Sequence, residues 1–211
     1  MFEDNFEAQV DLLAQVDLLQ REKDTLLANR SINTPQGIIV YRKQHEKLKQ
    51  QLKSDLKKSN TFVKKLKTIT SDGLQQCIRD TESVNLNLFV SEIVNAVVAT
   101  TYKATDVSTM VKLCVSMHHK YEEFCDPLLT GLKQALITPP AEDDPEAGKR
   151  KRIQIRIMVE LYQAGLLTED EYFIRLLRNL MGKGKSGPRV DLQGIGTLVK
   201  YGSEVLFGYV P

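Results

Sequence analysis

The chain has 211 residues, of which 42% are hydrophobic and 27% are charged, and its formal net charge is +2. This composition is typical of a folded globular protein and excludes a disordered acidic or basic tail. A net charge so close to zero also excludes a strong long-range attraction to nucleic acid or to membranes.

Cysteine usage and the lack of long apolar segments indicate the cellular compartment in which the protein is found. The three cysteines form no CxxC pair, which is typical of reduced thiols rather than of a disulfide framework. No segment has the roughly 18 uninterrupted apolar residues of a membrane span, and the acidic N-terminus lacks the apolar centre of a signal peptide. We therefore expect an intracellular protein of the cytoplasm, including its perinuclear region.

The first thirty residues contain the sequence AQVDLL twice in succession, at Ala8–Leu13 and Ala14–Leu19. Their apolar spacing predicts an amphipathic helix, although a six-residue repeat fits neither a coiled coil nor a known solenoid period. The Pro–Gly stretch Ser31–Gly37 then predicts a turn. We accordingly divide the chain into an N-terminal helical arm or lead-in, residues 1–41, and a main helical domain, residues 42–211.

A single long helix is predicted from Tyr41 to Lys67, with one packed face and one lysine surface. Apolar residues at spacings of three and four predict the packed face. Its members are Leu48, Leu52, Leu56, Val63 and Leu66. The lysine surface on the opposite side consists of Lys43, Lys47, Lys53, Lys57, Lys58, Lys64 and Lys65.

Further helices follow along the chain. Asn87–Thr101 is apolar nearly all round, which favours a helix buried between neighbours over a strand. Asp126 and Pro127 are typical of a helix start. Gly165 predicts the end of a later helix, and Asp191 predicts the cap of the last one.

These elements predict an all-α fold. No strand, hairpin or alternating βαβ pattern is visible, and six to eight helices in consecutive antiparallel pairs form either an α-solenoid or an irregular bundle. The helix pairs show only weak self-similarity, so the solenoid is an inference from packing rules rather than from visible repeats.

One segment is similar to a phosphate-binding loop. Gly182–Gly187 (GKGKSG) ends as such a loop does, but Asn179 stands where the first glycine is needed. Pro188 also follows where the loop should open a helix whose N–H groups bind phosphate. A flexible connection between helices is the simpler interpretation.

A second cluster, Cys114, His118, His119 and Cys125, contains potential metal ligands. Cys114 and His118 lie one helical turn apart, but the paired CxxC spacing of zinc sites is missing. Cys114 also lies on an apolar stripe, where cysteine packs as a small hydrophobe. No GxSxG, HExxH or cysteine–histidine signature is present. We therefore predict no catalytic residue, no metal and no cofactor, and expect that the protein is not an enzyme.

The lysine surface is the strongest remaining candidate site. Arg42–Lys67 contains ten basic and two acidic residues. Such a face is commonly just solvated, and the alternative is a docking surface for phosphates or for an acidic partner. Because the aromatic residues in and next to this run are only Tyr41 and Phe62, RNA binding there would be weak, non-specific and salt-sensitive.

Several segments resemble a known family. They are Ser54–Ile69, which contains FVKKLKTI, and then Asn85–Val94, Leu113–Phe124, Arg156–Leu167 and Phe207–Pro211. Together they resemble the first MIF4G domain of the second up-frameshift factors, the regulators of nonsense transcripts that act as scaffolds in nonsense-mediated mRNA decay. The resemblance covers residues 42–211, and residues 1–41 have no counterpart in it.

The resemblance implies a MIF4G or HEAT-like stack of helix pairs within a longer, non-catalytic scaffold for mRNA surveillance. The family's partners are the up-frameshift RNA helicase, the third up-frameshift factor and the kinase that phosphorylates the helicase. In the family, the third factor binds the last MIF4G domain and the helicase binds a C-terminal segment, so no partner-binding residue carries over to this chain. We predict a domain that docks decay factors. The alternative is a weak, non-specific RNA-binding module that uses the lysine surface.

Overall fold

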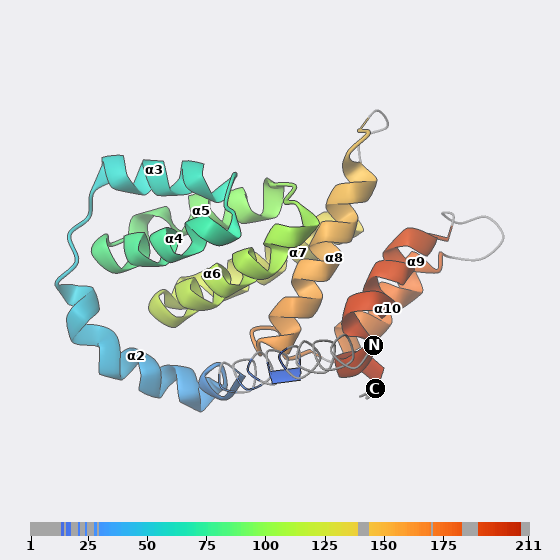
Figure 1. Ribbon diagram of the computed structural model, residues 1–211, viewed down its shortest axis with the longest axis horizontal. Coiled ribbons are helices and arrows are strands. Elements are labelled where there is room, and N and C mark those ends of the chain that lie inside the picture. Colours follow the sequence, from blue (N-terminus) through green and yellow to red (C-terminus); the bar gives the residue numbers. More distant parts are fainter. Residues whose placement is uncertain are drawn as a thin grey trace, which may run out of the picture.

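The computed structural model describes residues 14, 16–17, 21, 24, 28, 30–138, 144–169, 171–182 and 190–207. Over these residues the chain folds into helices and contains no strand (Figure 1). The α-helices are α2 (Pro35–Gln50), α3 (Leu56–Leu66), α4 (Ser71–Ser83), α5 (Val90–Ala99), α6 (Val107–Lys120), α7 (Cys125–Ile137), α8 (Ala147–Gln163), α9 (Glu171–Leu180) and α10 (Leu192–Phe207). Single 3₁₀ turns directly precede α5, α6 and α7, and these are η1 (Asn87–Phe89), η2 (Ala104–Asp106) and η3 (Glu122–Phe124).

The helices form two stacked layers. Helix α3 contacts α5, which contacts α7, while α4 contacts α6, α6 contacts α8, and α8 contacts α10. Contact between each helix and the next but one is the pattern of helix pairs stacked side by side. Figure 1 shows the pairs following one another from α3 and α4 to α9 and α10. The predicted all-α solenoid of helix pairs is confirmed.

Helix α6 lies at the centre of the core. It packs against α2, α4 and α8, and its Met110, Leu113 and Met117 side chains are at most 1% exposed. Tyr121 follows the helix directly, and its buried hydroxyl accepts a hydrogen bond of 3.0 Å from the backbone N–H of Leu86. A hydroxyl can be buried at little cost when it is bonded in this way. The C-terminal end of α6 is thereby joined to the turn before α5.

Several predicted helix boundaries are confirmed. Asn87–Thr101 forms η1 and α5 rather than a strand. Gly165 has φ +82°, and the N–H of Leu166 bonds the carbonyl of Leu161 at 2.9 Å, so α8 ends in a Schellman turn that favours glycine. The carboxylate of Asp191 accepts a bond of 2.8 Å from the N–H of Gly194 and caps α10.

The single helix predicted from Tyr41 to Lys67 is wrong. The chain forms α2 and α3 there, separated by the non-helical stretch 51–55. Asp55 has extended backbone and accepts a bond of 3.0 Å from the N–H of Lys58, which makes it the N-cap of α3. The carbonyl of Lys53 accepts a bond of 3.1 Å from the N–H of Asn85. The interruption is therefore stabilised both by a cap and by a contact distant in sequence.

Because of the interruption, the side of α3 that packs against the core also differs from the side that the sequence predicted. Leu56, predicted to be packed, is 68% exposed, whereas Phe62 and Leu66 are at most 2% exposed. Ser59 is completely buried, and Val63 packs against the core from a half-buried position. The predicted apolar stripe therefore holds for Val63 and Leu66 and fails at Leu56, while the side chain of Leu48 lies outside the described residues.

Two predictions from the sequence fall mainly outside the described residues. The doubled AQVDLL lies mainly outside them, and Gly182–Gly187 lies outside them except for Gly182. The position between residues 41 and 42 lies within α2, and the division of the chain at that position stays a prediction. No helix in the described ranges has both the length and the apolar content needed to cross a membrane.

Replacing Leu113 with aspartate tests the position of α6. We expect Leu113→Asp to lower the free energy of unfolding by about 4 kcal/mol or more, because it places an unpaired charge in the core. The exposed double change Lys57→Glu with Lys64→Glu is the control and should leave the helical melting curve close to that of the parent. Circular dichroism followed during heating measures both, and a parent-like melt for Leu113→Asp would contradict the position given to α6.

Candidate partner-binding surface

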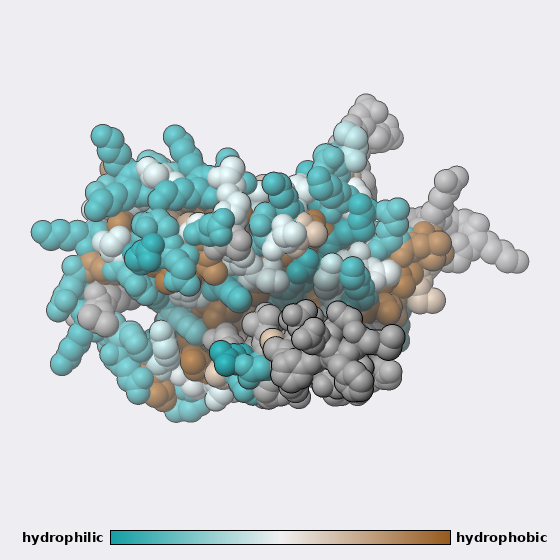
Figure 2. Space-filling model, viewed as in Figure 1, coloured by the Kyte–Doolittle hydropathy of each residue, from teal (hydrophilic) through white to brown (hydrophobic). Residues whose placement is uncertain are grey.

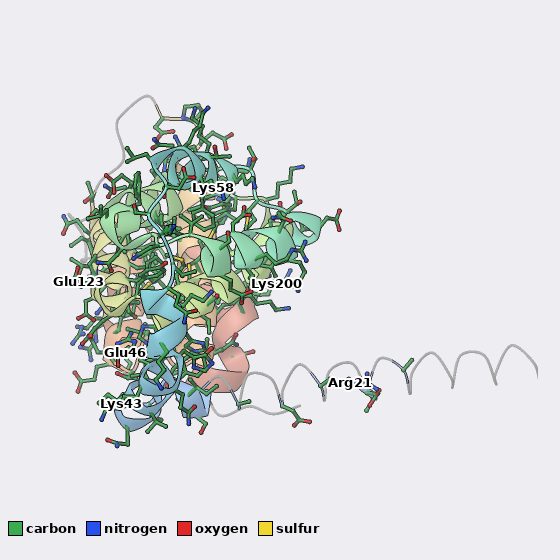
Figure 3. The ribbon with its side chains drawn as sticks, turned by 90° about the vertical axis from the view of Figure 1, so that its left-hand side faces the viewer. Arg21, Lys43, Glu46, Lys58, Glu123 and Lys200 are labelled. Atoms are coloured by element: carbon green, nitrogen blue, oxygen red, sulfur yellow. The ribbon has the colours of Figure 1, made fainter. Side chains whose placement is uncertain are left out.

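The structure divides the predicted lysine surface. Lys43 and Lys47 lie on α2, Lys53 lies in the connection, and the other four lie on α3. All seven are exposed except Lys65, which is half-buried. In Figure 3, Lys43 lies low in the view on α2 and Lys58 lies high on α3, because α2 packs on α6 while α3 packs on α4 and α5. The seven lysines therefore lie on two helices and their connection rather than on one helix face.

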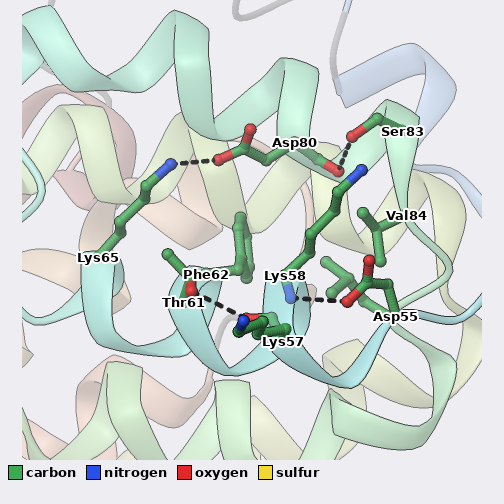
Figure 4. A pocket seen from close by; sticks show the side chains of 10 residues that line it. Asp55, Lys57, Lys58, Thr61, Phe62, Lys65, Asp80, Ser83 and Val84 are labelled. Atoms are coloured by element: carbon green, nitrogen blue, oxygen red, sulfur yellow. Dashed lines mark hydrogen bonds and ion pairs between the residues drawn. The ribbon is translucent and has the colours of Figure 1, made fainter.

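A groove between α3 and α4 gathers three of these lysines. Its volume is about 420 Å³, and Lys57, Lys58 and Lys65 line it from α3. The opposite wall carries Asp80 and Ser83 of α4. In Figure 4 the side chains of Lys58 and Lys65 extend from α3 toward α4, where Asp80 lies. We call this feature the α3–α4 groove.

The two acids of the α3–α4 groove have partners within the protein. The carboxylate of Asp55 caps α3. The carboxylate of Asp80 accepts bonds of 2.7 Å from Lys65 Nζ and from Gln76 Nε2. Burial acts to raise the pKa of Asp80, but the hydrogen bonds from Lys65 and Gln76 outweigh it and hold that pKa below its usual value. The same bond to Asp80 raises the pKa of Lys65.

The remaining cations of this surface lack such partners. Lys57, Lys58 and Lys64 form no ion pair with any acid of the described residues. Lys53 is also exposed and is not ion-paired there. Positive charge on α3 that is not balanced by a neighbouring carboxylate is therefore available to a negatively charged partner. The sequence identified these lysines, but Asp80 lies fifteen residues after Lys65 and no local pattern pointed to it.

The basic run Lys149–Arg152 contrasts with the lysines of α3. Lys149 pairs with Glu146 at 3.1 Å, Arg150 with Asp144, and Lys151 with Asp191 at 2.9 Å. The fourth residue of the run, Arg152, donates to the side chain of Gln193. Because each of the four side chains has a partner within the chain, this run stabilises the start of α8 and its contact with α10.

Three of the four candidate metal ligands have other roles. Cys114 and Cys125 are free, buried thiols, and burial raises the pKa of Cys114 to about 12 and that of Cys125 to about 11. His119 Nε2 lies 2.8 Å from Asn33 Oδ1, which requires the tautomer protonated at Nε2. Within the described ranges, no three histidine, cysteine or acidic side chains are grouped as metal ligands would be.

Polar side chains attach α2 and the residues before it to the rest of the fold. Asn33, which bonds His119, also donates a bond of 2.7 Å to the carbonyl of Ala164. Arg42 donates a bond of 2.7 Å to the carbonyl of His118. Burial first, and then the positive charge of Arg42, lower the pKa of His118 and of His119 to about 4. Both imidazoles are therefore neutral at pH 7.

Comparison of the sequence with curated proteins finds clear relatives, although no protein-family model matches the chain. Over 134 residues the chain is 31% identical to the Regulator of nonsense transcripts UPF2 of Arabidopsis thaliana, a match that covers 61% of this chain and 11% of that protein. Over 120 residues it is 35% identical to the human Regulator of nonsense transcripts 2, which covers 57% of this chain and 9% of the relative. The chain thus corresponds to only a small part of these proteins.

A comparison of folds gives a consistent result. The crystal structure of the first MIF4G domain of the human nonsense mediated decay factor UPF2 matches with a TM-score of 0.66 and 24% sequence identity. The match covers 90% of this chain and 66% of that chain. Residues 42–211 alone would cover less than 90% of the chain, so the match extends N-terminal of residue 42, where the sequence resemblance had no counterpart.

The fold is that of a MIF4G domain, an all-α stack of helix pairs. Over 57–61% of its length the chain is similar in sequence to regulators of nonsense transcripts, the proteins whose first MIF4G domain it resembles. The recognition made from FVKKLKTI and the other segments is confirmed.

The two buried histidines predict a dependence of stability on pH. Their pKa in the folded protein is about 4, below the value of about 6.5 expected in the unfolded chain. The unfolded chain therefore binds more protons between these values, so stability should be complete above pH 6.5 and fall as the pH decreases toward 4. The slope is at most about 1.4 kcal/mol per pH unit for each proton.

Urea unfolding at pH values between 7.5 and 5 measures this slope, in a range above the titration of most carboxylates. The control is His119→Gln, whose amide can still donate to Asn33 but cannot take up a proton. We expect a smaller loss of stability for this variant on acidification. An equal loss in the parent and in His119→Gln would contradict the assignment.

Proposed function

We propose that this chain is a non-catalytic scaffold domain of the nonsense-mediated mRNA decay machinery and that it docks decay factors within a larger protein. The observation that carries the proposal is the 31–35% identity to regulators of nonsense transcripts in two kingdoms of life. A stack of helix pairs supports the same role, because such a fold buries one core and leaves long outer surfaces for partners.

The proposal that the domain is non-catalytic is supported by the roles of its reactive side chains. The thiols of Cys77, Cys114 and Cys125 are all buried, and burial raises their pKa, so a thiolate nucleophile is disfavoured. His119, a candidate base by type, bonds Asn33 and positions the segment before α2. These groups stabilise the fold, and catalysis would need such groups to converge on a substrate.

The partners and the cellular location are also proposals. The up-frameshift helicase, the third up-frameshift factor and the kinase of the helicase are the decay factors that the sequence resemblance implies, and the cytoplasm with its perinuclear region is the proposed location. Weak RNA binding by the lysine surface stays the alternative prediction. Lys43 and Lys47 lie on α2 while four of the other lysines lie on α3, so the seven do not share one helix face and give it no additional support.

Removal of residues 1–211 from the gene, in the cells that express the protein, tests the proposed function. We expect transcripts with a premature stop codon to accumulate several-fold relative to matched transcripts with a normal stop codon, because an assembly that holds the decay factors would be incomplete. Quantitative measurement of both transcripts after transcription is blocked gives their half-lives. Unchanged half-lives, with the shortened protein present at its normal level, would contradict a role in decay.

A further inference from the structure

The α3–α4 groove combines exposed positive charge with nearby apolar side chains. Lys57 and Lys58 line it without an ion-pair partner in the described residues. The two carboxylates beside them are bonded to other groups, Asp55 to the N-terminus of α3 and Asp80 to Lys65 and Gln76. The groove therefore presents uncompensated positive charge.

Apolar surface lies next to these cations. Phe62, Val84 and Leu86 line the groove, but they are at most 3% exposed and offer a partner little apolar surface. Leu56 at the start of α3 is 68% exposed, and Leu88 in η1 is 76% exposed. The hydrogen bond between Lys53 and Asn85 joins the two segments three residues before each leucine, so both leucines belong to the same corner of the fold as the groove. Exposed leucines beside a groove offer contacts to an apolar side chain of a partner.

We propose that the α3–α4 groove binds a short acidic segment of a partner protein, whose carboxylates pair with Lys57 and Lys58 and whose large apolar side chain contacts the exposed Leu56 and Leu88. The inference rests on the proposed docking role, and it assigns that role to one place and one partner chemistry. Charge complementarity carries it, since carboxylates would meet two ammonium groups that pair with no acid in the described part of the chain.

The geometry favours a peptide over RNA. Phe62 is the aromatic residue that lines the groove, and it is only 2% exposed, so no ring face is available for stacking against a base. Lys43 and Lys47 lie on α2 and do not line the groove, so the groove itself offers few cations to a run of phosphates. Figure 2 shows a mostly hydrophilic face over α3 and α4, which fits an exposed surface for a charged partner.

Fluorescence anisotropy with a synthetic probe tests the inference on the complete chain. The probe is a labelled twelve-residue peptide of four Glu-Glu-Leu repeats, and a peptide with Gln in place of Glu shows the need for charge. We expect the first peptide to bind at near-physiological salt, and the second to bind at least about tenfold more weakly, a difference of about 1.4 kcal/mol. A labelled twelve-nucleotide oligouridine should bind more weakly than the acidic peptide.

Two double variants with the same change in net charge locate the binding. Lys57→Glu with Lys58→Glu alters the groove, and we expect it to lower the affinity for the acidic peptide at least about tenfold. Lys103→Glu with Lys112→Glu changes two exposed lysines elsewhere and should leave the affinity within about twofold of the parent. Helical melting curves verify that both variants fold. The inference is overturned by no peptide binding, by equal losses in the two variants, or by tighter binding of oligouridine.

The result can be separated from the test of the proposed function. If removal of residues 1–211 blocks decay but the peptide does not bind at the groove, the assignment of the groove fails and the scaffold role stands. If the peptide binds at the groove but that removal leaves decay unchanged, the scaffold role fails and the groove remains a peptide-binding site.

Discussion

The burial of α6 between its neighbours is the constraint on which the rest of the structure depends. This helix packs against α4 on one side and α8 on the other, and it also contacts α2. Because its side chains such as Leu113 are almost completely buried, each neighbouring pair must stack in a fixed position to cover them. Tyr121 extends the constraint to the turn before α5 by its hydrogen bond to Leu86. The α3–α4 groove is positioned by this core, to which Phe62, Val84 and Leu86 of its lining belong.

Local signals in the sequence predicted much of the fold. Gly165 and Asp191 act through their own backbone geometry and short-range hydrogen bonds, so their roles were visible from neighbouring residues alone. The separation of α2 from α3 was not predicted, since the stretch 51–55 contains neither glycine nor proline. A distant contact, from Asn85 to Lys53, takes part in that interruption. The misplaced packing of Leu56 followed from treating the two helices as one.

The candidate site was predictable only in part for the same reason. Sequence pattern identified the lysines of α3 because they are numerous and closely spaced. It could not show which of them are neutralised, because Asp80 comes from a different helix and takes Lys65 as its partner. It also placed Lys43 and Lys47 on one helix with the lysines of α3, whereas the structure places them on α2. Which charges of a surface are free to bind a partner therefore depends on ion pairs between helices, which local sequence patterns do not show. Most of the fold, in contrast, could be predicted from local signals.

Hydrogen exchange of the backbone amides tests the central role of α6 most directly. If the core is organised around this helix, amides of Val107–Lys120 should exchange only when the whole domain unfolds, and should be among the slowest in the chain. Helix α2, which is held largely by polar contacts and whose Ile39 and Val40 are 46% and 45% exposed, should exchange faster. Exchange of α6 as rapid as that of α2 would show that the stack does not depend on α6 and would contradict the account.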